Sequence, residues 1–157
     1  MVGLLLEPYK RSLRARLIAH PRFYFFDTGV LNALCGRLTA KINPVLRGKL
    51  FEHFVILEVF RKLNYMRDES KLFYWRTNHG AEVDLLIEKH GEIRLAIEIK
   101  TNSRLGGRDL SGLRAFANEH PNTQLVVINT QPQAYEIDDI KILPYHDFFN
   151  RLPDWLN

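Results

Sequence analysis

Short apolar runs recur along the chain and predict a set of β-strands joined by turns. The runs are rich in branched and aromatic residues, and Asn, Gly and charged residues punctuate them, which is typical of strands bounded by turns. We expect strands at residues 23–26, 72–75, 82–88, 93–100, 124–129 and 140–143. The run at 124–129 holds four consecutive apolar residues, so it indicates a buried strand.

Other stretches repeat their apolar residues at helical spacing. We expect helices at residues 30–38, 48–63, 109–117 and 145–152. Asp27 and Asp109 precede two of them and are residues that commonly cap a helix. In the helix at 48–63, Glu52 shares its face with the apolar stripe that begins at Val55. An acid on the buried face of a helix is unusual, whereas His53 is expected to have a surface or capping role.

Charged residues interrupt two neighbouring strands where the surrounding residues are apolar. Glu82 and Asp84 alternate with apolar residues on one strand, and Glu98 and Lys100 do so on the next. A solvated sheet face is one interpretation of such alternation. However, the neighbouring apolar residues indicate strands that are buried on both faces. Because buried carboxylates are costly without a compensating cation, the pattern favours a metal site beside an ammonium group.

Asp84 on one strand, followed by Glu98-Ile99-Lys100 on the next, resembles the signature of the PD-(D/E)XK nuclease-like superfamily, with Val83 where the superfamily name has proline. The segments 21–30, 48–55 and 74–77 also resemble a narrower family. That family is an uncharacterised domain found C-terminal to AAA-type ATPase modules in many prokaryotic proteins. The resemblance implies an α/β (α+β) fold with a restriction-endonuclease-like core, in which helices flank a central mixed β-sheet.

The resemblance also implies a site. Asp84, Glu98 and the carbonyl group of Ile99 would bind Mg²⁺ or Mn²⁺, hard cations that prefer oxygen ligands. Lys100 would orient the attacking water or help to deprotonate it. Glu52 would point toward the strand carboxylates and bind water or a second ion. The implied reaction is metal-dependent hydrolysis of phosphodiester bonds in nucleic acid.

Two further residues lie beside this predicted site. Glu82 is an auxiliary acid on the strand of Asp84, and Arg76 either steadies a phosphate group or pairs with one of the acids. The alternative to an enzyme is a catalytically silent module for binding nucleic acid or a partner, for dimerisation, or for regulating an ATPase, because a fold does not fix a function.

Composition limits these interpretations. With 157 residues, of which 46% are hydrophobic, the chain is long enough for one globular domain with its own core. No apolar run is long enough to span a bilayer, and the N-terminus lacks the pattern of a signal peptide. Cys35 is the single cysteine, so no internal disulfide can form. We therefore expect a cytoplasmic protein, with Cys35 as a small core residue.

The net charge of +4 comes from the first 22 residues, because the remaining chain is neutral. We expect residues 1–22 to form a basic arm or connector and residues 23–157 to form the nuclease-like domain. Basic residues of the arm can neutralise nucleic-acid phosphates; these are Lys10, Arg11, Arg14 and Arg16. The alternative is a joint to an AAA-type ATPase module, in cis or in trans, with a homodimer as another arrangement. The chain lacks the Gly-rich Lys-Ser/Thr loop that would bind ATP itself.

Overall fold

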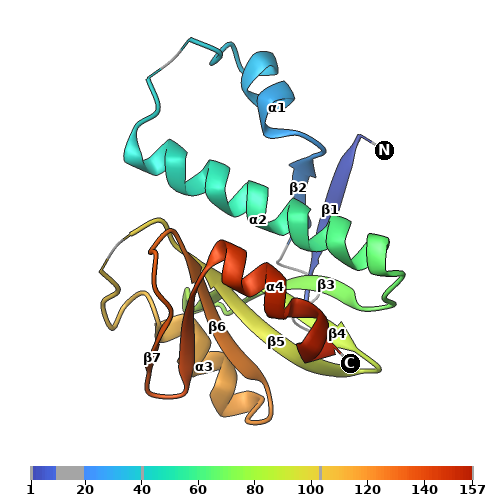
Figure 1. Cartoon of the computed structure of the whole chain (residues 1–157), viewed down its shortest axis with the longest axis vertical. Helices are drawn as coiled ribbons and strands as arrows, with labels where there is room; N and C mark the ends of the chain where they lie inside the picture. The colour runs from blue at the N-terminus through green and yellow to red at the C-terminus, as the bar shows by residue number, and fades with distance from the viewer. Residues whose placement is uncertain (1, 10–19, 40, 103, 157) are drawn as a thin grey trace.

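The computed structural model describes residues 2–9, 20–39, 41–102 and 104–156. In this part of the chain, eight strands form one mixed sheet in the order β2-β1-β3-β4-β5-β6-β8-β7. The strands are β1 (Gly3–Pro8), β2 (Arg22–Phe25), β3 (Lys71–Arg76), β4 (Glu82–Lys89), β5 (Glu92–Ile99), β6 (Gln124–Asn129), β7 (Tyr135–Ile137) and β8 (Ile140–Pro144). Of the four helices in this part of the chain, three pack on the sheet, whereas the first has no buried residue and lies near the end of β2 and the long second helix (Figure 1).

Strand β5, which carries Glu98, lies near the centre of the sheet. It pairs antiparallel with β4 and parallel with β6, and β4 pairs antiparallel with β3. Beyond this centre, β6 runs parallel to β8, and β8 pairs antiparallel with β7. The strands predicted from the apolar runs are confirmed, although several bounds shift by a residue or two.

The N-terminal strand β1 was not predicted. It lies between the edge strand β2 and strand β3. It runs parallel to β3, with Glu7 opposite Phe73, and antiparallel to β2, with Leu5 opposite Phe23. The local sequence offers only a short apolar run at residues 4–6, and the strands with which this run pairs lie further along the chain. Part of the segment 1–22 is therefore a strand of the same sheet as Asp84 and Glu98.

The four helices are α1 (Thr28–Leu34), α2 (Pro44–Met66), α3 (Ser111–Glu119) and α4 (Tyr145–Leu156). Helix α2 starts earlier than predicted because Asn43 caps it, accepting from the amide of Leu46 at 2.8 Å, and Pro44 occupies its first turn. Asp27 caps α1 as predicted. The prediction that Asp109 caps α3 was wrong: its carboxylate accepts from the amide of Gly106, and the cap position is Leu110.

Helices α2 and α4 cover one face of the sheet, and α3 covers the other. Strict alternation of faces breaks within β4: Leu85 and Ile87 pack toward α2, whereas Val83 and Leu86 pack toward α3. The pairing of β3 with β4 shifts register at the same place. Asp84 therefore lies at an irregularity of the sheet.

Two further features concern the chain outside the sheet. Cys35 follows α1 and is exposed, so the expectation that it is a core residue was wrong. None of the helices in the described segments is both long enough and apolar enough to cross a membrane.

Candidate acidic site

Two buried carboxylates lie side by side on the central strands, Asp84 on β4 and Glu98 on β5. Each residue is only 7% exposed. The amide of Ile99 donates to Asp84 Oδ2 at 2.9 Å, and Lys100 Nζ contacts Glu98 Oε1 at 2.6 Å. Among the described residues, Glu98 Oε2 is buried and has no hydrogen-bond partner. We call Asp84 and Glu98 the inner pair.

The inner pair is electrostatically unfavourable without an added cation. Burial raises the pKa of Asp84 to about 8, and the charges of Glu98 and Glu52 add to this effect. Burial also raises the pKa of Glu98, although Lys100 opposes the shift. Burial alone would lower the pKa of Lys100, but the charges of Glu98 and Asp84 raise it above its usual value. Lys100 is therefore a charged ammonium group at neutral pH.

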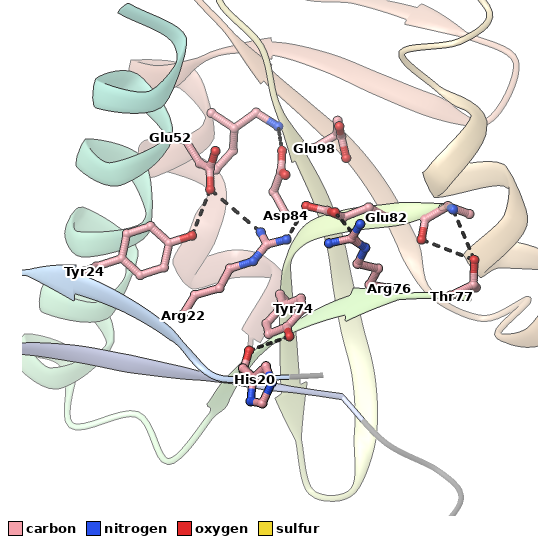
Figure 2. A network of polar contacts seen from close by, with 12 residues as sticks. His20, Arg22, Tyr24, Glu52, Tyr74, Arg76, Thr77, Glu82, Asp84 and Glu98 are labelled. Atoms are coloured by element: carbon pink, nitrogen blue, oxygen red, sulfur yellow. Dashed lines mark hydrogen bonds and ion pairs between the residues drawn. The ribbon is translucent and has the colours of Figure 1, made fainter. Parts of the chain in front are cut away.

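Two half-exposed carboxylates flank the inner pair, Glu52 from α2 and Glu82 from β4; we call them the outer pair. Figure 2 shows the side chain of Arg22, from β2, between them. Arg22 Nη2 donates to Glu82 Oε1, and Arg22 Nη1 lies 3.9 Å from Glu52 Oε1. The hydroxyl of Tyr24 donates to the same Glu52 oxygen at 2.8 Å. Each carboxylate of the outer pair thus has a partner from β2, which pairs antiparallel with β1. We call β1 and β2 the N-terminal hairpin.

Aromatic residues of β2 and β3 hold this arrangement in place. The guanidinium carbon of Arg22 lies 4.2 Å from the centre of the Tyr74 ring, a cation–π contact. The Tyr74 hydroxyl in turn donates to the carbonyl of His20 at 2.7 Å (Figure 2). Burial raises the pKa of Tyr24, and the Glu52 charge adds to the effect, so Tyr24 remains a neutral donor.

The structure brings together most of the residues that the sequence singled out. Glu52, Glu82, Asp84 and Glu98 lie in one network of polar contacts, in which Lys100 contacts Glu98 and Arg22 lies between Glu52 and Glu82 (Figure 2). Arg76 is 60% exposed and lies at the rim, with its Nε 3.7 Å from Glu82 Oε2. Ile99 contributes its amide to Asp84. The predicted phosphate-binding residues Lys10, Arg11, Arg14 and Arg16 lie outside the described residues.

The arrangement differs from the expected metal site in one respect. Within the segments that the structure describes, no group of three or more His, Cys, Asp or Glu residues is placed to hold a metal ion. The four acids instead form two pairs, each with its own cation. Lys100 accompanies the inner pair and Arg22 accompanies the outer pair.

Sequence reasoning missed Arg22, Tyr24 and Asn129, and it misplaced His53. Arg22 and Tyr24 alternate on a short strand, and only the pairing of that strand with β1 brings them to the acids. Asn129 follows Ile128, whose carbonyl accepts the Lys100 amide; its side chain is buried, and its Nδ2 has no partner among the described residues. His53 is buried rather than at the surface, and its Nε2 lies 2.7 Å from the carbonyl oxygen of Phe25.

One comparison with known proteins gives a residue range, and that range includes this site. The sequence model of the family described as "Domain of unknown function (DUF4143)" matches residues 47–148, which include all four carboxylates. The chain is 36% identical over 101 residues to an uncharacterised protein of Mycobacterium bovis and, equally, to one of Mycobacterium tuberculosis. The aligned region is 62% of this chain but only 22% of each relative. No solved structure matches the chain.

Proposed function

The chain belongs to the family described as Domain of unknown function (DUF4143), and we propose that it is a divalent-cation-dependent phosphodiesterase that cleaves nucleic acid in the cytoplasm. The observation that carries the proposal is the inner pair: two buried carboxylates, one of which has an unpartnered oxygen, next to a charged lysine. Buried carboxylates of this kind usually pair with, or coordinate, a cation.

The residues present suit a magnesium or manganese ion. Both ions prefer oxygen ligands and retain part of their water shell, so two carboxylates and one carbonyl are a sufficient protein contribution. Glu98 Oε2 lacks a partner, and one oxygen of Asp84 is already oriented by the amide of Ile99. We assign Asp84, Glu98 and the carbonyl of Ile99 as the ligands. A bound divalent cation would act as a Lewis acid that stabilises the charge developing on the phosphoryl oxygens.

The protein's own groups would position the reactants. Lys100 is protonated and held by Glu98, so it donates a hydrogen bond to the attacking water or to a phosphate oxygen rather than serving as the base in the metal-free state. Arg76 is exposed at the rim, where its planar guanidinium can contact a phosphate. The arrangement of Asp84 and Glu98-Ile99-Lys100 on neighbouring antiparallel strands supports our assignment of the core as restriction-endonuclease-like.

One observation favours a second candidate function. Glu52 and Glu82 are already occupied by Tyr24 and Arg22, which is what a catalytically silent module on the same fold would show. Such a module would bind nucleic acid, an AAA-type ATPase module in cis or in trans, or a second copy of the chain. In either case Lys10, Arg11, Arg14 and Arg16 are our proposed phosphate contacts.

A cleavage assay on labelled single-stranded DNA, double-stranded DNA and RNA separates the two functions. We expect the wild type to cleave at least one substrate with Mn²⁺ or Mg²⁺ and not with EDTA. Asp84→Asn, Glu98→Gln and Lys100→Met should each lower the rate by about a hundredfold or more. Glu58→Gln is the matched control, since Glu58 lies on α2 but pairs with Arg61 away from the site. Metal-induced stabilisation without cleavage would support the silent module, and unchanged cleavage by Asp84→Asn would contradict the proposal.

A further inference from the structure

Lys100, which accompanies the inner pair, and Arg22, which accompanies the outer pair, are placed differently relative to their carboxylates. Lys100 contacts only one oxygen of the inner pair, and the other oxygen of Glu98 lacks a partner among the described residues. Arg22, in contrast, lies between two carboxylates that come from different elements, α2 and β4 (Figure 2). The inner pair can accept a further cation, whereas the outer pair already holds one.

Arg22 is fixed from several sides. Its guanidinium donates to Glu82, lies 3.9 Å from Glu52 and packs over the ring of Tyr74. Its side chain is 25% exposed, compared with 60% for Arg76, the other arginine that approaches Glu82. An arginine side chain stays charged at every accessible pH. The charge therefore leaves the outer pair only if the Arg22 side chain or strand β2 moves.

A divalent cation between Glu52 and Glu82 would compete with the hairpin for one oxygen of each carboxylate. Arg22 binds Glu82 Oε1, and Tyr24 binds Glu52 Oε1. A fixed guanidinium between the carboxylates would also repel an incoming Mg²⁺ or Mn²⁺ at close range. If Arg22 were neutral, Glu52 and Glu82 would face each other with no cation between them, which is the condition that favours metal binding.

We propose that Arg22 is a built-in counter-ion that masks a second divalent-cation site formed by Glu52 and Glu82. In the native protein, Arg22 restricts divalent binding to the inner pair, so that the site holds one ion rather than two. The binding of one ion at the inner pair rests on the proposed function. The masking of the outer pair is measured independently, as the difference in bound ions between a variant and the wild type.

The test is the number of Mn²⁺ ions bound per chain, counted by titration calorimetry and by electron paramagnetic resonance of free Mn²⁺. Arg22→Gln removes the charge but keeps a polar side chain, and it should bind one more ion than the wild type. Arg22→Lys retains a positive charge and should bind the same number as the wild type. Arg76→Gln is the matched control, because it removes an arginine near Glu82 that lies outside the pair; it too should match the wild type.

Further variants keep the test decisive if Arg22→Gln fails to fold. Glu82→Gln in the native background should leave the ion count unchanged, because the outer pair binds no divalent ion while Arg22 is present. In a folded Arg22→Gln protein, adding Glu82→Gln should abolish the extra ion. An equal count in Arg22→Gln and the wild type, an extra ion in Arg22→Lys, or a loss of an ion in Glu82→Gln alone would each overturn the inference.

The proposed function and this inference can fail separately. A wild type that binds no ion, with one ion bound by Arg22→Gln, would contradict the inner metal site and support the masking of the outer pair. One ion bound by the wild type and by Arg22→Gln would support the inner metal site and contradict the masking of the outer pair.

Discussion

Asp84 is the residue whose environment departs most from that of an ordinary surface carboxylate. It is buried, it lies beside Glu98 and near Glu52, and its one described hydrogen bond comes from the amide of Ile99. Burial and the neighbouring negative charges raise its pKa from 3.8 to about 8. The folded protein therefore binds this proton more tightly than the unfolded chain does.

This difference predicts how stability depends on pH. The stabilisation from the bound proton is complete below about pH 4 and is lost as the pH rises toward 8. With EDTA present, the free energy of unfolding of the wild type should fall between pH 5 and pH 8. Asp84→Asn should flatten this decline and be more stable than the wild type at pH 8, measured by urea denaturation.

Asp139→Asn is the control for this series, because Asp139 is an exposed aspartate outside the site. It should follow the wild type across the pH range. A wild type whose stability does not fall between pH 5 and pH 8 would show that Asp84 is not held in a desolvated, acid-rich environment.

At the scale of the elements, α3 packs directly on the strand that carries Glu82 and Asp84. A Cβ atom on Gly112 would lie 1.8 Å from the carbonyl oxygen of Glu82, so only glycine permits this approach. Gly112→Ala should push α3 away from β4 and lower the free energy of unfolding by about 1–3 kcal/mol. It should also weaken Mn²⁺ binding, because the start of β4 must move.

Gly107→Ala provides the comparison, since a Cβ atom there meets no neighbour within 4 Å. Its stability and its Mn²⁺ affinity should equal those of the wild type. If urea denaturation shows Gly112→Ala to be as stable as Gly107→Ala, the close contact between α3 and β4 is not as described.

The elements differ in how well the sequence predicts them, and the reason is the range of the interactions that form them. The strands around Asp84 and Glu98 and the helix around Glu52 follow from local apolar patterns. Strand β1 depends on pairing with β2 and β3, and its short apolar run does not indicate these partners. The cap at Asn43 and Pro44 in the first turn of α2 are local signals, but the apolar spacing alone predicts a start at residue 48.

The site shows the same division. The positions of Asp84, Glu98 and Lys100 were predicted from their spacing on two neighbouring strands. The contacts of Arg22 with Glu82 and Tyr24 with Glu52 were not, because they span 60 and 28 residues along the chain. The resemblance to a nuclease superfamily indicated which acids converge, and it carried no information about which cation accompanies each pair.

At the scale of the whole molecule, one sheet joins the N-terminal hairpin to the acidic centre. Strand β2, at one edge, carries Arg22 and Tyr24, and the central strands β4 and β5 carry the inner pair. A change in the position of the hairpin would therefore alter the charge around Glu52 and Glu82 without moving Asp84 or Glu98. The chain covers 22% of the length of its mycobacterial relatives, so the activity and partners of a longer family member belong with our proposals.

The most direct test of the central claim is the release of protons when Mn²⁺ binds, measured by titration calorimetry at pH 7 in two buffers of different ionisation enthalpy. Because the pKa of Asp84 is about 8, this carboxyl holds a proton at pH 7 and must lose it to coordinate a metal ion. At pH 7 the wild type should release close to one proton for each Mn²⁺ bound to the inner pair, and it should release much less at pH 9. Asp84→Asn should release fewer protons than the wild type at pH 7. Absence of Mn²⁺ binding, or equal proton release by the wild type and Asp84→Asn, would contradict a divalent-cation site at Asp84 and Glu98.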